Sequence, residues 1–104
     1  MTRERIPCVY ILATGFHGTL YTGVTSNLVG RIIQHRDGTF DGFTKRYGIK
    51  RLVYYEVGDT MESVILREKQ IKRWKREYKY NLIERQNPGW NDLAVGLGLP
   101  PLED

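Results

Sequence analysis

Three short runs of β-branched and aromatic residues, each bounded by turn residues, constrain the fold of this chain more than any other feature. They occupy residues 9–12, 20–24 and 52–57. Residues 14–18, between the first two runs, include Gly15 and Gly18 and have the composition of a turn, so these two runs are predicted to form a β-hairpin. The third run makes a third strand. The pattern predicts one small antiparallel sheet.

A helix is predicted between the second and third strands. Residues 25–27 offer N-cap side chains, and Leu28, Ile32 and His35 then follow at helical spacing. Gly38 is expected to end this helix. Residues 39–48 are expected to form a loop over the sheet.

A longer helix is predicted over residues 60–78. Asp59 and Glu62 have the spacing of a capping box at its start. A further short helix is expected at residues 81–85. The order β-β-α-β-α-α predicts the α+β class, with a three-stranded antiparallel sheet flanked by helices.

The composition indicates one domain and no membrane-spanning segment. The chain has 104 residues, of which 40% are hydrophobic, enough for one core but too few for two. No stretch approaches the roughly 18 apolar residues that a membrane span needs. We expect residues 1–86 to form the domain, and the Pro- and Gly-rich residues 87–104 to form a tail that Trp90 holds to the core.

Cysteine usage bears on the compartment. Cys8 is the single cysteine, so no disulfide can form within the chain, which is typical of a reducing compartment. Its expected role is that of a small apolar strand residue. We therefore expect a cytoplasmic protein.

Glu68 stands where a solvated charge is not expected. In the helix predicted over residues 60–78, an apolar stripe lies within roughly 60° of Glu68. The stripe consists of Met61, Val64, Ile65 and Ile71. A carboxylate on a buried face needs a cation partner, so Glu68 is a candidate functional residue.

The chain is basic, with a formal net charge of +4, and its cations are clustered. The candidate nucleic-acid-binding residues are Lys45, Arg46, Lys69, Lys72, Arg73, Lys75 and Arg76. A surface of this kind can neutralise phosphates and release counterions. The alternative for any basic helix is a solvated surface without a partner.

Two tyrosine motifs and a series of polar residues follow one another along the chain. The segments are Cys8-Val9-Tyr10 and Tyr21-Thr22-Gly23, followed by Arg31, His35, Glu68 and Asn81. This order resembles the GIY-YIG nuclease superfamily over residues 6–83. The resemblance is greatest to its small stand-alone members, which are related to the amino-terminal domain of the excinuclease C subunit, and it implies the fold predicted above.

The chain departs from the family pattern at framework positions. Cys8 and Val9 stand where the first motif has Gly and Ile, and Thr22 stands where the second has Ile. Val24 occupies a place where some branches carry Lys, so the phosphate contact of those branches is not carried over to this chain.

The resemblance implies metal-dependent hydrolysis of phosphodiester bonds. Glu68 would hold one Mg²⁺ or Mn²⁺, with waters and substrate oxygens as the other ligands. Arg31 would form paired hydrogen bonds with phosphate oxygens. Either Tyr21 or His35 would take the proton from the attacking water, and histidine as a residue type titrates nearer neutral pH than tyrosine.

The remaining candidates have supporting roles by resemblance, and all have a structural alternative. Tyr10 would orient the water or the phosphate, and Asn81 would order Glu68 or the substrate. In the structural alternative the tyrosines are half-buried strand residues, Arg31 and Glu68 form an ion pair, His35 is a surface or core histidine, and Asn81 caps a helix.

Two classes of function remain open from the sequence. The preferred function is a DNA endonuclease with one site that cuts one strand at a time. Whether RNA is also cut is left open by the sequence, and a role in repair or recombination is suggested by the excision nuclease. The alternative is a module that binds nucleic acid with little cleavage. A third possibility is a subunit that cuts only when a protein partner supplies substrate recognition.

Overall fold

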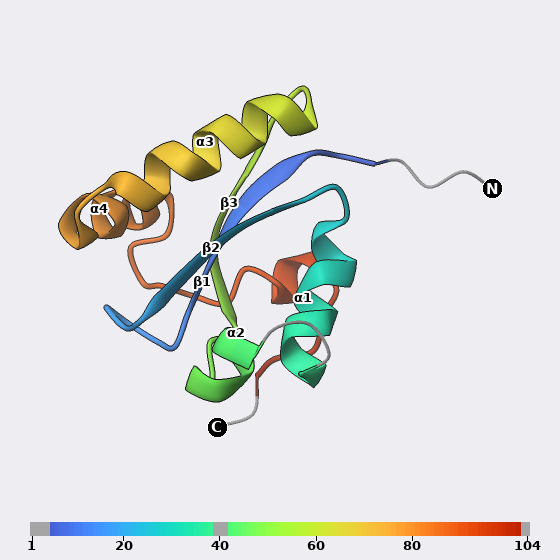
Figure 1. Ribbon diagram of the computed structural model, residues 1–104. Coiled ribbons are helices and arrows are strands. Elements are labelled where there is room, and N and C mark those ends of the chain that lie inside the picture. Colours follow the sequence, from blue (N-terminus) through green and yellow to red (C-terminus); the bar gives the residue numbers. More distant parts are fainter. Residues whose placement is uncertain (1–4, 39–41, 103–104) are drawn as a thin grey trace.

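A three-stranded antiparallel sheet with helices on both faces forms the centre of the molecule (Figure 1). The computed structural model describes residues 5–38 and 42–102. The strands are β1 (Cys8–Ala13), β2 (Leu20–Thr25) and β3 (Arg51–Val57), in the spatial order β2-β1-β3. The α+β class and the three predicted strands are confirmed.

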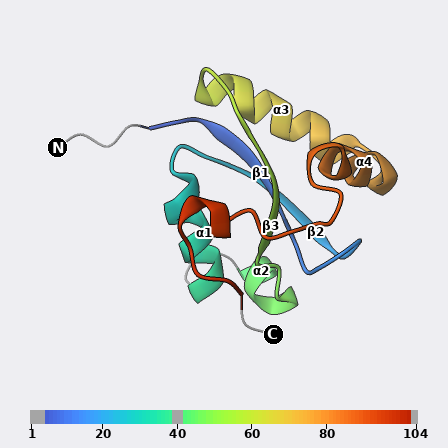
Figure 2. The same cartoon turned by 180° about the vertical axis from the view of Figure 1, so that it is seen from behind.

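The sheet divides the core into two layers, and helices cover both. The helices are α1 (Leu28–Asp37), α2 (Gly42–Tyr47), α3 (Met61–Arg73), α4 (Arg76–Gln86) and the short 3₁₀ helix η1 (Val95–Leu97). Alternate residues of β1 point to opposite faces. Tyr10 and Leu12 pack with Ile32 of α1, whereas Val9 and Ile11 pack with α3 and α4. Figures 1 and 2 show α1 on one face of the sheet and α3 on the other.

Helix α1 has the ends that its sequence predicts. The Asn27 side chain accepts a hydrogen bond from the Gly30 backbone N–H at 3.2 Å, which caps the first turn. Gly38 ends the helix with φ of 79°, a left-handed conformation that glycine adopts without steric cost.

The predicted loop over residues 39–48 is wrong for residues 42–47, which form α2; residues 39–41 lie outside the described residues. Packing against the rest of the protein stabilises the helix in this segment. Thr44 is buried, and its carbonyl accepts a hydrogen bond at 2.9 Å from the backbone N–H of the fully buried Ile49. The Thr44 hydroxyl also lies 3.0 Å from Nδ1 of His35 in α1, a contact between two helices that the local sequence does not reveal.

Helix α3 begins one residue later than predicted. Its N-cap is Thr60, which forms a capping box with Ser63 through hydroxyl groups at 3.0 and 3.3 Å from the backbone N–H groups. Asp59 and Glu62 therefore do not form the box.

The predicted helix over residues 60–78 is two helices. α3 ends at Arg73 because Trp74 takes an extended conformation with ψ of 150°, which packs its ring against the core. The short helix expected at residues 81–85 is the second half of α4.

The C-terminal segment packs on the sheet. Trp90 is 1% exposed, and its indole N–H donates to Glu84 Oε2 at 2.7 Å, as the prediction of a core contact requires. Farther on, Asp92 accepts two hydrogen bonds of 2.8 Å from Arg36 and one of 3.3 Å from the Leu52 backbone N–H. Figure 2 shows this segment passing along β3. Within the described part of the chain, no helix has the length and apolarity of a membrane span.

Asn87 joins α4 to the sheet, and its replacement should destabilise the fold. Its side-chain amide donates at 3.0 Å to the carbonyls of Val53 and Asn91, and its oxygen accepts from the Asn91 N–H. Because Asn87→Ala leaves these buried groups unpaired, we expect it to lower the free energy of unfolding by about 1–3 kcal/mol in urea denaturation. Asn91→Ala, which removes an exposed side chain, should cost less than about 0.5 kcal/mol. Equal effects would contradict this assignment.

Candidate active site

Two tyrosines of the β1–β2 hairpin lie on one face of the sheet. The register pairs Tyr10 with Gly23 and Leu12 with Tyr21, so both phenol rings point toward α1. Their ring centroids are 6.3 Å apart with an interplanar angle of 41°. The two tyrosines therefore share one face of the sheet.

His35 of α1 completes this cluster. Its side chain is 1% exposed, with Nε2 2.9 Å from the Tyr10 hydroxyl and Nδ1 3.0 Å from the Thr44 hydroxyl of α2. The imidazole ring also meets Tyr21 edge-on at a centroid distance of 5.2 Å. Since both ring nitrogens have partners, the orientation of the imidazole is fixed from two sides.

Gly23 makes room for the Tyr10 ring. A Cβ atom at position 23 would lie 2.7 Å from both Cζ and the hydroxyl oxygen of Tyr10, closer than a nonbonded contact permits. The glycine of the second motif is therefore needed for close approach between neighbouring strands.

Gly23→Ala should displace the Tyr10 ring and break its hydrogen bond to His35. We expect a loss of about 1–3 kcal/mol in the free energy of unfolding, the usual cost of overpacking a core. Chemical denaturation measures this loss. Gly96→Ala is the control, because a Cβ there meets no atom within 4 Å. If Gly23→Ala is as stable as Gly96→Ala, the close approach is not what the glycine provides.

Arg31 lies on α1, one turn before His35, at the edge of the sheet. It lines a polar hollow of about 330 Å³. The other lining residues are Arg5, Val24, Thr25, Ser26, Asn27, Gly30, Gln34 and Met61. Because Met61 is the first residue of α3, the starts of α1 and α3 meet at this hollow beside β2.

Glu68 lies on a flank of α3. Val64 and Ile71 are buried beneath the helix, whereas Ile65 is 37% exposed, so the predicted apolar stripe is wrong at Ile65. Arg67 lies on the other flank, where its Nε donates to Glu56 of β3 at 3.0 Å. The buried line therefore runs between Glu68 and Arg67.

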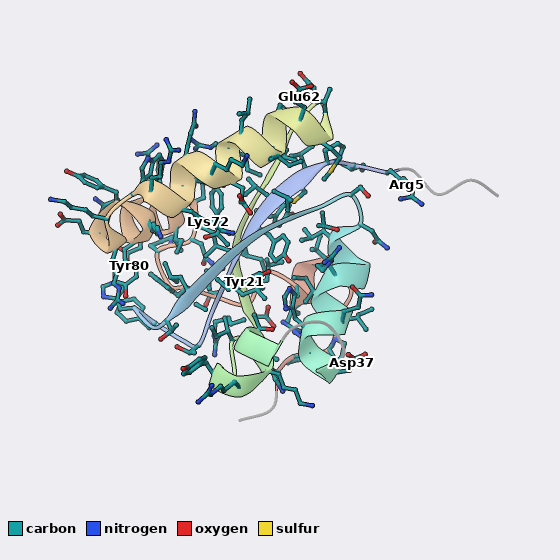
Figure 3. The ribbon with its side chains drawn as sticks, in the orientation of Figure 1. Arg5, Tyr21, Asp37, Glu62, Lys72 and Tyr80 are labelled. Carbon is teal, nitrogen blue, oxygen red and sulfur yellow. The ribbon has the colours of Figure 1, made fainter. Side chains whose placement is uncertain are left out.

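This placement turns Glu68 toward β2. α3 packs over β1 and β2, and the flank opposite the β3 contact is the one that faces β2. The Glu68 side chain is 16% exposed and its Oε2 lies 3.0 Å from Nζ of Lys72, which is 51% exposed. The expected cation partner is thus Lys72, one turn along the same helix. Figure 3 shows Lys72 on the α3 side of β2 and Tyr21 on the α1 side.

Asn81 does not join the other candidates. It is exposed on α4 and lines a hollow with Arg67, Trp74 and Tyr78, on the flank of α3 that faces away from Glu68. This position does not support the expectation that Asn81 orders Glu68 or the substrate. The buried amide of the region is that of Asn87, which has a structural role.

The candidate nucleic-acid-binding residues are exposed in two groups. Lys45 and Arg46 lie in the last turn of α2. The others follow α3 and its junction with α4: Lys69, Lys72, Arg73, Lys75 and Arg76. Burial lowers the pKa of Lys79, and the charges of Arg76 and Lys72 lower it further. Positive charge is therefore concentrated at this junction.

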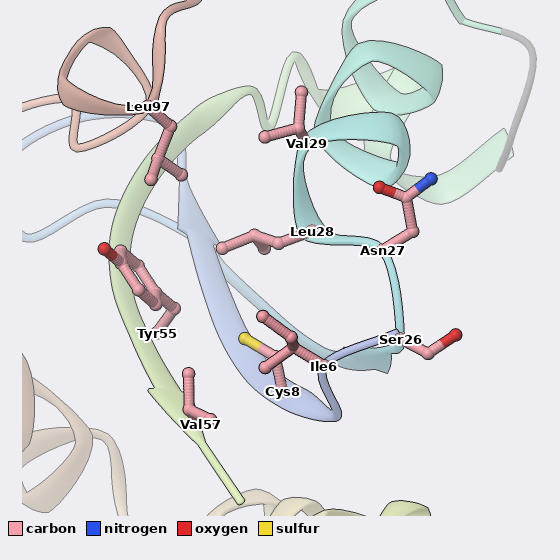
Figure 4. A pocket seen from close by; sticks show the side chains of 9 residues that line it. All are labelled: Ile6, Cys8, Ser26, Asn27, Leu28, Val29, Tyr55, Val57 and Leu97. Carbon is pink, nitrogen blue, oxygen red and sulfur yellow. The ribbon is translucent and has the colours of Figure 1, made fainter. Parts of the chain in front are cut away.

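An apolar hollow of about 270 Å³ shares Ser26 and Asn27 with the polar hollow at Arg31, but no charged side chain among the described residues lines it (Figure 4). Cys8 is among the residues that line it, and burial raises the pKa of its thiol to about 11. The thiol stays protonated at neutral pH and is a poor nucleophile. The interpretation of Cys8 as an apolar strand residue agrees with its 2% exposure.

Three features of the site were missed by sequence reasoning. The ion pair between Lys72 and Glu68 could have been predicted, because the two residues have the i,i+4 spacing of a helical ion pair. Gly23 was quoted as part of a motif, but its contact with Tyr10 depends on strand register. Thr44 has no local signal, because its contact with His35 joins two helices.

Comparisons with known proteins give a family match and several relatives. The family model of the GIY-YIG catalytic domain matches residues 6–81. A UPF0213 protein of Syntrophus aciditrophicus is 41% identical over 81 residues, which cover 77% of this chain and 91% of the relative. One from Staphylococcus saprophyticus is 39% identical over 66 residues, or 64% and 80% of the two chains.

A third relative is less similar to this chain. The UPF0213 protein of Haloquadratum walsbyi is 35% identical over 66 residues, which cover 64% of this chain and 74% of the relative. No solved structure matches this chain. The family model spans well over half of the sequence and includes both tyrosine motifs, Arg31, His35 and Glu68. This chain belongs to the GIY-YIG nuclease family.

Proposed function

We propose that this protein is a divalent-metal-dependent endonuclease that hydrolyses phosphodiester bonds in DNA at a single site. The observation that carries the proposal is the cluster formed by Tyr10 of β1, Tyr21 of β2 and His35 of α1, whose rings contact one another. Arg31 stands one turn from His35, and Glu68 faces the same strand from α3.

Tyr21 is proposed as the group that takes the proton from the attacking water. His35 is 1% exposed with partners at both ring nitrogens, so its role is to orient Tyr10 and to pack against Tyr21. Tyr21 is only partly buried and lies at the edge strand, where water and substrate have access.

Arg31 is proposed to bind the scissile phosphate. A guanidinium group matches two phosphate oxygens with paired hydrogen bonds and stays charged at all relevant pH values. The hollow that it lines is polar and open beside β2. Positive charge placed there before the reaction stabilises the charge that develops on the phosphoryl oxygens.

Glu68 fits a hard divalent cation. Within the described residues, no three His, Cys, Asp or Glu side chains form a metal-binding group, so Glu68 would be the carboxylate ligand and water and substrate oxygens would complete the coordination. The Lys72 ammonium lies 3.0 Å from this carboxylate and is half exposed, so it can move aside for a cation. When bound, Mg²⁺ or Mn²⁺ would supply further charge stabilisation at the phosphate.

The test is cleavage of end-labelled DNA by the purified protein. Single-stranded, duplex, nicked and branched substrates are incubated with Mg²⁺, with Mn²⁺ or with EDTA, and the products are separated under denaturing conditions. We expect metal-dependent products that carry a cut in one strand. Parallel assays with RNA strands show whether both nucleic acids are cut. Binding to DNA without any product under all these conditions would favour the binding module instead.

A further inference from the structure

The flank of α3 that faces away from Glu68 carries a hollow of about 540 Å³ with unusual chemistry. It lies between α3 and α4 and is lined by Arg67, Trp74, Tyr78, Asn81, Leu82 and Arg85. Aromatic rings, guanidinium groups and one amide converge here, and the volume lies in the range of small-ligand sites. The groups proposed for hydrolysis do not line it.

One wall of the hollow is a guanidinium group held in a fixed plane. Arg67 donates from Nε and Nη2 to the Glu56 carboxylate at 3.0 and 3.3 Å, and its Cζ lies 5.3 Å from the centroid of the Trp74 ring. Tyr54 also donates to Glu56 from below. Although burial opposes it, the contact with Glu56 raises the pKa of Arg67, so the group stays charged. A planar cation fixed in this way is a stacking surface for a base.

The opposite wall comes from one face of α4. Tyr78, Asn81 and Arg85 are spaced by three and four residues, so their side chains lie in a row along the helix. Tyr78 is 54% exposed. Its ring offers a second stacking surface, the Asn81 amide offers a donor and an acceptor, and Arg85 offers a charge at the rim. Leu82, 7% exposed, gives the hollow an apolar floor.

We propose that this hollow binds one unpaired base of a nucleic-acid strand, with Tyr78 and Arg67 on its two faces, Asn81 at its polar edge and Arg85 at the adjoining phosphate. The inference rests on the proposed function, because the bound strand is taken to belong to the nucleic acid that the protein cuts. A strand held here would cross the exposed cations of α3 to reach Glu68. DNA and RNA share this chemistry.

The test measures binding in EDTA, where cleavage is blocked, by fluorescence anisotropy of labelled oligo-dT, oligo-U and a duplex of equal length. Tyr78→Ala should weaken single-strand binding about 5- to 100-fold, the usual range for loss of one stacked base. Tyr78→Phe should bind within about twofold of the unchanged protein, because the ring remains. Duplex binding should not change. Comparison of dT with U shows which strand is preferred.

Two controls separate stacking from general effects. Phe16→Ala removes another exposed aromatic ring, at the tip of the hairpin, and should leave single-strand binding unchanged. An oligonucleotide whose bases are replaced by abasic sites should bind the unchanged protein as weakly as oligo-dT binds Tyr78→Ala. Equal binding of the abasic strand and oligo-dT by the unchanged protein would overturn the proposal.

Salt dependence tests the role of Arg85. Arg85→Gln should reduce the slope of log affinity against log salt concentration by about 0.7, the value for one phosphate contact on a single strand. Tyr78→Ala should leave the slope unchanged. Lys50→Gln, which removes a charge from a distant hollow, is the matched control. An Arg85→Gln slope equal to that of the unchanged protein would remove the phosphate contact from the proposal.

The two proposals can fail independently. Cleavage is measured separately, with metal, on the substrates described above. Metal-dependent cutting without Tyr78-dependent binding of single strands would overturn the base site and leave the nuclease. Tyr78-dependent binding without cutting by the unchanged protein would overturn the nuclease and leave the base site.

Discussion

Glu68→Gln is expected to lower the rate of DNA cleavage by about 10²- to 10³-fold or more, the range found when one preorganised electrostatic group is lost from a reaction site. Glutamine has nearly the same shape but no charge, so the site loses its ligand for a divalent cation. Binding of DNA should change little, because the cations along α3 remain. Rates under single-turnover conditions and affinities in EDTA measure the two effects separately.

The control is a carboxylate elsewhere on the same helix. Glu62 is exposed in the first turn of α3, at the end remote from Lys72 (Figure 3). Glu62→Gln should cleave at the rate of the unchanged protein. If Glu68→Gln also cleaves at that rate, the carboxylate is not a metal ligand in the reaction.

Arg31→Lys is expected to lower the cleavage rate by about 10²-fold, although the positive charge is kept. An ammonium group cannot form the paired hydrogen bonds by which a guanidinium fits two phosphate oxygens. Arg31→Ala should be at least as slow. Single-turnover rates at saturating protein separate this effect from weaker binding.

Arg73→Lys is the matched control for Arg31. Arg73 is exposed at the end of α3, where a general attraction to phosphates needs charge and not a particular geometry. Arg73→Lys should therefore cleave normally. Equal rates for the Arg31 and Arg73 variants would show that Arg31 also acts as a charge alone.

The sequence predicted the hairpin well because its signals are local. Glycines in the turn and β-branched residues on either side specify two paired strands. Whether Tyr10 and Tyr21 share a face depends on how the two strands are aligned. The contact of Gly23 with Tyr10 follows from the register of the two strands, which the turn composition does not fix.

The position of the division between α3 and α4 could not be read from the sequence. No proline or glycine marks residues 74 and 75, so the local pattern placed the end of the first helix at residue 78. The helix ends at Arg73, and Trp74 takes an extended conformation in which its partly buried ring packs against the core. That contact exists only in the folded protein. This break redirects the chain and carries Asn81 to the far flank.

The position of Glu68 was predictable only in part. Helical periodicity correctly made Glu68 a neighbour of buried residues, but it could not say on which flank the buried line falls. That line is decided by packing against the sheet, where Val64 and Ile71 are buried and Ile65 is not.

Because Arg67 and Glu68 lie on opposite flanks of α3, the number of residues between the start of this helix and Arg67 must be kept. Arg67 and Glu68 are consecutive, yet one pairs with β3 and the other faces β2. The Thr60 cap fixes where the helix begins, so inserting or deleting one residue between Thr60 and Arg67 would rotate both side chains by about 100°. Exchanges of exposed residues in this segment, such as Glu62, are therefore tolerable where insertions and deletions are not.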